Sequence, residues 1–137
     1  MNKKLACLFV SLFLGAGAVR SQTVNCVAAL VGGQPVTLMD LEIAREFGFF
    51  DPAVGGAGGD PRLAVLDALI GQKAVLEMAK EPLPFGPEDF ALTLASVRER
   101  LGPAAFAGKL RKFGLREDDL RPYLEERLRF EKVVSAR

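Results

Sequence analysis

The residue types that most often perform catalysis are scarce in this chain of 137 residues. It contains no histidine, which is the commonest general base and the commonest metal ligand in proteins. Its two cysteines, Cys7 and Cys26, are too few for a zinc site of the usual cysteine and histidine kind. Ser96 and Ser135 have no base partner that a pattern identifies. We therefore expect a protein that is not an enzyme and that uses neither a metal nor another cofactor.

Two other features could be given a chemical role. Glu125 and Glu126 are adjacent acids, but consecutive helical residues point about 100° apart. Because arginines alternate with these acids, we interpret them as a solvated, ion-paired helix face. Residues 51–59 (DPAVGGAGG) hold four glycines in nine residues but lack the lysine and Ser/Thr ending of a phosphate-binding loop. This stretch is typical of a flexible connector.

The first 21 residues have the pattern of a secretory signal peptide. Lys3 and Lys4 precede residues 5–14 (LACLFVSLFL), an apolar run too short for a stable membrane anchor. Cleavage after Ala18 and cleavage after Ser21 both fit the sequence, and a retained anchor is the alternative. One domain, residues 22–137, would remain.

Removal of that segment changes the charge of the domain. The loss of Lys3, Lys4 and Arg20 leaves 15 basic residues against 17 acidic ones, a net charge of −2. A slightly acidic domain does not favour nucleic acid as a partner. Cys26 alone then remains, so no disulfide forms within the domain. We expect Cys26 to be a small buried hydrophobe, with a reactive or intermolecular thiol as the alternative.

The domain is predicted to open with a β-hairpin followed by a helix. Residues 24–31 and 34–37 are β-type runs, and the two glycines between them suit a two-residue turn. Pro35 cannot donate to a ladder and leaves one side of its strand open. Thr37 and Asp40 have the spacing of a capping box, which predicts a helix over residues 38–47. We expect Leu38, Leu41, Ala44 and Phe47 to face inward.

Residues 60–80 are predicted to form the helix around which the others pack. Asp60 is a suitable N-cap, and Pro61 suits the first helical position. Apolar residues recur at three and four residues and extend beyond one face, so we expect this helix to be surrounded on all sides. Gly71 interrupts it, which indicates close approach by a neighbouring backbone.

Three more helices complete the predicted fold. They cover residues 88–101, residues 103–113 before Gly114, and a last helix from near Asp119 with Pro122 in its first turn. The fold class is therefore mainly α: a small domain of about five helices around a central helix, with an N-terminal β-hairpin.

The order of these elements resembles the N-terminal domain of SurA-like periplasmic chaperones, a family that includes peptidyl-prolyl isomerases. Three stretches are similar to family motifs: residues 24–44 (VNCVAALVGGQPVTLMDLEIA), 66–80 (LDALIGQKAVLEMAK) and 112–134 (KFGLREDDLRPYLEERLRFEKVV). Two positions depart from the family pattern. Arg116 stands where a Thr or Ser cap is usual, and Pro122 is unusual.

The resemblance implies chaperone-like binding in the periplasm. Larger family members continue into parvulin-type isomerase domains, which these 137 residues lack, so isomerase activity is not carried over. It implies that the domain holds unfolded or partly folded outer-membrane or secreted proteins through an open apolar face. We expect that face on the last helix, at Leu124, Leu128 and Phe130. The alternatives are a structural subunit completed by a second copy or by a separate isomerase, and a truncated family member without an independent role.

Overall fold

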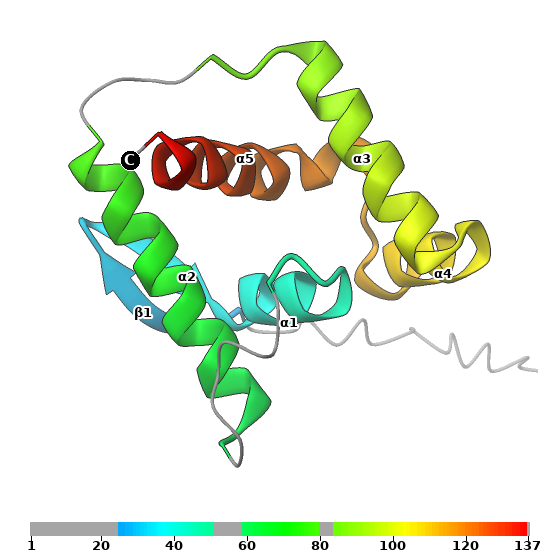
Figure 1. Ribbon diagram of the computed structural model, residues 1–137. Helices are drawn as coiled ribbons and strands as arrows, with labels where there is room; N and C mark the ends of the chain where they lie inside the picture. The colour runs from blue at the N-terminus through cyan, green and yellow to red at the C-terminus, as the bar shows by residue number, and fades with distance from the viewer. Residues whose placement is uncertain (1–24, 51–58, 80–83, 137) are drawn as a thin grey trace, which may run out of the picture.

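A computed structural model describes residues 25–50, 59–79 and 84–136 (Figure 1). The described part begins with an antiparallel hairpin of β1 (Val27–Val31) and β2 (Gln34–Thr37). Gly32 and Gly33 join the strands with φ angles of 54° and 79°, a left-handed conformation that favours glycine. The predicted hairpin and its turn are confirmed.

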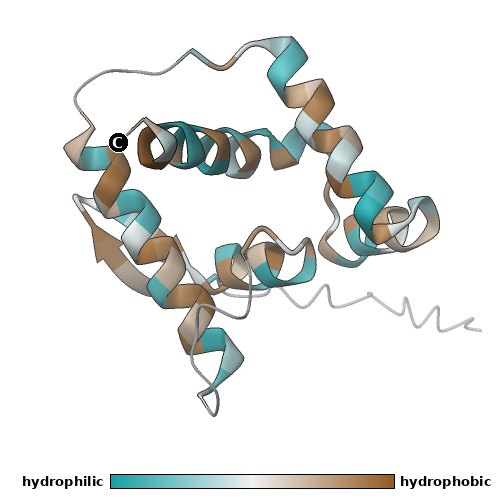
Figure 2. Cartoon of the chain, in the orientation of Figure 1, coloured by the Kyte–Doolittle hydropathy of each residue, from teal (hydrophilic) through white to brown (hydrophobic). Residues whose placement is uncertain are grey.

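The hairpin has one buried side and one open side. Val36 is fully buried in the core, whereas Val27 is 61% exposed and Leu30 is 68% exposed. Cys26 lies just before β1 and is exposed, so the prediction of a buried Cys26 was wrong. Strand β1 is shorter than predicted and begins only at Val27. Figure 2 shows that β1 is hydrophobic along its length.

Helix α1 (Leu38–Glu46) starts at the predicted capping box. The Thr37 hydroxyl accepts from the Asp40 backbone N–H at 3.2 Å, and the Asp40 carboxylate accepts from the Thr37 N–H at 2.8 Å. The helix buries Leu41, Ile43 and Ala44. Leu38 is 49% exposed, so its predicted inward position was wrong.

Helix α2 (Pro61–Met78) is capped by Asp60, whose carboxylate accepts from the Arg62 N–H at 2.9 Å. The predicted start is confirmed, but the prediction that this helix is surrounded was wrong. The buried residues Val65, Leu69 and Gln72 lie on one face of the helix, which contacts α1, α5 and β1. Leu63 remains 59% exposed and Met78 67% exposed. Among the described residues, a Cβ at Gly71 would meet no atom within 4 Å, so the predicted close neighbour is not found there.

The rest of the domain consists of α3 (Pro87–Leu101), α4 (Pro103–Phe113), the short 3-10 helix η2 (Glu117–Leu120) and α5 (Arg121–Ser135). Gly114 ends α4 in the left-handed conformation, with φ 66°. Pro122 lies in the first turn of α5, as predicted. At Arg116 the cap is supplied by the Asp119 carboxylate, which accepts from the Arg116 N–H at 2.7 Å.

Helix α5 occupies the position that the sequence analysis gave to α2. It lies between α2 and α3 and contacts both (Figure 1). Leu120 and Leu124 are fully buried beside an aromatic cluster in which the Phe47 ring lies 5.8 Å from both Phe49 and Phe106.

The predicted fold class is confirmed: within the described residues, the domain has five α-helices and an N-terminal two-stranded hairpin. No helix among these residues is long and apolar enough to cross a membrane. The predicted signal segment and most of the glycine-rich stretch, residues 51–58, lie outside the described residues.

Candidate functional site

The three residues predicted to form an open apolar face lie at different depths. Leu124 is fully buried, and it belongs to the same core cluster as Leu120 and Phe106. It therefore presents no surface, which corrects the prediction for this residue. Leu128, one turn later on α5, is half-buried, as is Phe130. The helix thus leaves the core between Leu124 and Leu128.

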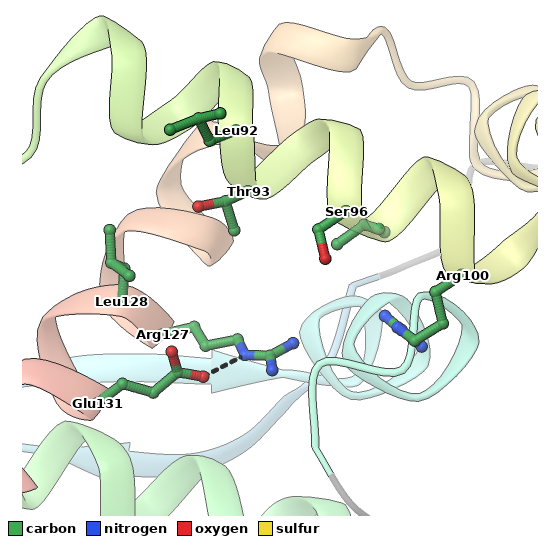
Figure 3. A pocket seen from close by; sticks show the side chains of 8 residues that line it. Leu92, Thr93, Ser96, Arg100, Arg127, Leu128 and Glu131 are labelled. Atoms are coloured by element: carbon green, nitrogen blue, oxygen red, sulfur yellow. Dashed lines mark hydrogen bonds and ion pairs between the residues drawn. The ribbon is translucent and has the colours of Figure 1, made fainter. Parts of the chain in front are cut away.

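Leu128 lines a cleft of about 320 Å³ between α3 and α5 (Figure 3). Five residues of α3 and three of α5 form the walls of this α3–α5 cleft: Leu92, Thr93, Ser96, Val97, Arg100, Arg127, Leu128 and Glu131. Phe130 is not among them. The structure therefore places one of the three predicted residues in the cleft and adds residues from α3 that the sequence analysis did not select.

The cleft follows from how α3 presents its residues. Phe90, Leu94 and Val97 recur at four and three residues and bury one face of the helix. Leu92 lies off that stripe and is 73% exposed. Leu92 and Ser96 are one helical turn apart, so they lie on the same side of α3, and both line the cleft. The sequence signal for this position is an apolar residue out of phase with the buried stripe.

Two arginines hold defined positions along the cleft. Arg127 donates from Nε to Glu131 Oε1 at 2.8 Å, within α5. Arg100 donates from Nη2 to the Phe47 carbonyl oxygen at 2.7 Å, which ties the end of α3 to the end of α1. Gly48 has a φ angle of 62°, and a Cβ at this position would clash with the Arg100 guanidinium. The Arg100 side chain is therefore held beside the cleft by the turn after α1.

The cleft is chemically divided along its length. Figure 3 shows Leu92 and Leu128 toward one end and Arg100 at the other, with the Arg127 side chain extending between them. The hydroxyl of Thr93 is used locally, since it donates to the Asp89 carbonyl oxygen at 2.7 Å. The lining residues are suited to apolar contact at one end and to hydrogen bonding with an anionic group at the other.

The other candidate residues have structural partners. Glu125 pairs with Arg129 on α5, and Glu126 accepts from Lys73 of α2 at 2.9 Å. The predicted pairing with an arginine on the same helix is confirmed for Glu125. For Glu126 it was wrong, because the partner is a lysine of another helix whose side chain is only 16% exposed. Across the described residues, no group of three or more acids or cysteines is arranged to hold a metal ion.

The geometry described here is that of a binding cleft with an apolar end and a cationic end. The similarity to SurA-like chaperones rests on the sequence motifs and stays a prediction. Comparisons with protein-family models, with curated proteins and with solved structures found no match to this chain.

Proposed function

We propose that this chain is an exported, chaperone-like domain that holds unfolded or partly folded polypeptides and has no catalytic activity of its own. Its clients would be outer-membrane or secreted proteins in the periplasm, as the family resemblance implies. The signal-like pattern of residues 1–21 supports the export part of the proposal.

The observation that carries the binding proposal is the α3–α5 cleft. Leu92 is 73% exposed at its edge, and Leu128 is half-buried in its wall. A groove between two helices with exposed leucines suits the apolar side chains of an extended or amphipathic polypeptide. Such contacts depend on apolar burial more than on sequence, so a broad range of clients fits this site.

Aggregation of a chemically unfolded reporter protein, followed by light scattering, tests this proposal. The purified chain should suppress aggregation, whereas Leu92→Asp and Leu128→Asp should weaken suppression because a charge at either position opposes apolar contact. Leu63→Asp is the matched control: Leu63 is 59% exposed on α2 and does not line the cleft. It should behave as wild type.

Circular dichroism of each variant separates lost binding from lost folding. Phe130→Asp extends the test to the third predicted residue, which lies on α5 outside the cleft lining. If the folded Leu92 and Leu128 variants suppress aggregation as well as wild type does, the cleft is not the client site.

A second candidate function is supported by the open side of the hairpin. Val27 and Leu30 are exposed there, and β1 has no strand partner except β2 among the described residues. Exposed edge strands tend to pair with another chain. A structural subunit completed by a second copy or by a separate isomerase would cover this surface. Sedimentation of wild type and Leu30→Lys tests the second copy: only wild type should dimerise.

A further inference from the structure

The charged end of the α3–α5 cleft has more positive than negative side chains. Arg100 and Arg127 line it, and Glu131 is the only acid among the described lining residues. Two guanidinium groups facing one cleft repel each other unless anionic groups lie between them. The Glu131 carboxylate accepts a hydrogen bond from Arg127 at 2.8 Å. Among the described contacts it makes no such bond to Arg100.

The Arg127–Glu131 pair is of the kind that an incoming group can replace. Its members are four residues apart on one helix, and their side chains are 32% and 51% exposed. Pairs with this spacing and exposure contribute little to stability in water. A carboxylate from another chain could take the place of Glu131 at small cost.

Arg100 is prepared for the same role by a different contact. One of its terminal nitrogens is engaged by the Phe47 carbonyl oxygen at 2.7 Å, which orients the planar group. A guanidinium has five N–H donors in a rigid fork, so donors remain for a ligand. Arginines held in this way bind carboxylates with two parallel hydrogen bonds.

From this charge complementarity we propose that the cleft takes an acidic amphipathic polypeptide segment. A carboxylate of the segment lies between Arg100 and Arg127, and neighbouring apolar side chains pack on Leu92 and Leu128. This inference rests on the proposed function and specifies its clients: acidic-apolar segments are preferred over neutral ones, and basic segments are rejected. The two leucines and the net charge of −2 of the predicted mature domain favour a polypeptide over a nucleic acid.

The test uses three fluorescent peptides and the whole domain. The peptides share leucines at i and i+4 spacing and carry glutamate, glutamine or lysine at the same polar positions. Fluorescence anisotropy should give the tightest binding for the glutamate peptide, about threefold to tenfold tighter than for the glutamine peptide at low salt. The difference should shrink at physiological ionic strength, where the Debye length is about 8 Å.

Two substitutions in the cleft should act in opposite directions on the glutamate peptide. Arg127→Gln should reduce its affinity to near that of the glutamine peptide. Glu131→Gln should raise its affinity about twofold to fivefold, because the competing carboxylate is removed. Arg111→Gln, on an exposed residue of α4 outside the cleft lining, is the control and should change nothing.

The outcomes separate this inference from the proposed function. Equal binding of the glutamate and glutamine peptides, or no gain with Glu131→Gln, overturns the acidic preference. The proposed function survives that result if Leu92→Asp still weakens both peptides. Failure of all three peptides to bind overturns both proposals. A single-stranded oligonucleotide that binds and is weakened by Arg127→Gln overturns the choice of a polypeptide as occupant.

Discussion

At the scale of single residues, Asp40 connects three parts of the domain. Its Oδ2 accepts from the backbone and the hydroxyl of Thr37, at 2.8 Å and 2.7 Å, and its Oδ1 accepts from the Tyr123 hydroxyl at 2.8 Å. One carboxylate therefore joins the end of β2, the start of α1 and the side of α5. Burial, with the Asp40 hydrogen bond, raises the pKa of the Tyr123 phenol well above its usual range.

Glu46 is the residue through which we expect the domain to be sensitive to acid. Lys109 and Lys112 of α4 donate to its two carboxylate oxygens at 2.6 Å and 2.9 Å. These hydrogen bonds, that from Lys109 first, lower the pKa of Glu46 from 4.5 to about 2. Because the folded-state pKa is depressed, the stabilisation is complete above the unfolded-state pKa and is lost as the pH falls toward 2.

We expect Glu46→Gln to lower the free energy of unfolding at neutral pH by roughly 1–2 kcal/mol. This is less than the pKa shift of Glu46 alone would give, because solvent screens the charge of the exposed Lys112. The difference from wild type should shrink steadily below about pH 4.5. Urea unfolding at a series of pH values measures it, with Glu99→Gln on the exposed side of α3 as the control. A difference that stays constant with pH would contradict the assignment.

At the scale of elements, α2 and α5 exchange the roles that apolar periodicity gave them. Helix α2 carries apolar residues around much of its circumference, yet it buries only Val65, Leu69 and Gln72. Helix α5 is much more polar, since six of the eight residues from Glu125 to Lys132 are charged. It still lies between α2 and α3. Apolar content alone therefore did not identify the helix in the middle.

This arrangement predicts unequal costs along α2. Leu69→Ala should lower the free energy of unfolding by about 2–5 kcal/mol, because Leu69 is 5% exposed and its loss leaves a cavity. Ile70→Ala should cost less, since Ile70 is half-buried. Leu63→Ala should stay within about 0.5 kcal/mol of wild type. Urea unfolding of the three variants checks the order, and equal losses at Leu69 and Leu63 would mean that α2 is covered on both sides.

At the scale of the whole molecule, export is the property that most affects the proposed function. If residues 1–21 are a signal peptide, the protein isolated from its native cells should begin after Ala18 or after Ser21. Intact-mass measurement of the purified protein determines this directly. Leu12→Arg, which interrupts the apolar run, should leave the uncleaved chain inside the cell.

A protein that begins at Met1 and is recovered with membranes would show that the segment is a retained anchor. That result would move the domain from free solution to the membrane surface without changing its fold. The aggregation and peptide experiments on the purified domain would still apply.

Local features of the sequence determined where the elements start and stop. Thr37 with Asp40, Asp60 with Pro61, the Gly32–Gly33 turn and Gly114 all appear in the structure as predicted. Each acts on backbone groups within four residues, through a hydrogen bond or a restricted φ angle. Such local effects can be predicted from the sequence without knowing the tertiary structure. The helical class of the domain followed from these signals and from apolar spacing.

Which faces are covered and where the cleft lies depend on contacts between distant parts of the chain. Apolar spacing gives a helix a face, but the neighbour that buries it comes from a distant part of the chain. Asp40 and Tyr123 are 83 positions apart in the sequence, and Lys73 and Glu126 are 53 positions apart. For the same reason Leu124 is buried, Cys26 is exposed, and the α3–α5 cleft joins leucines and arginines that no single motif contains.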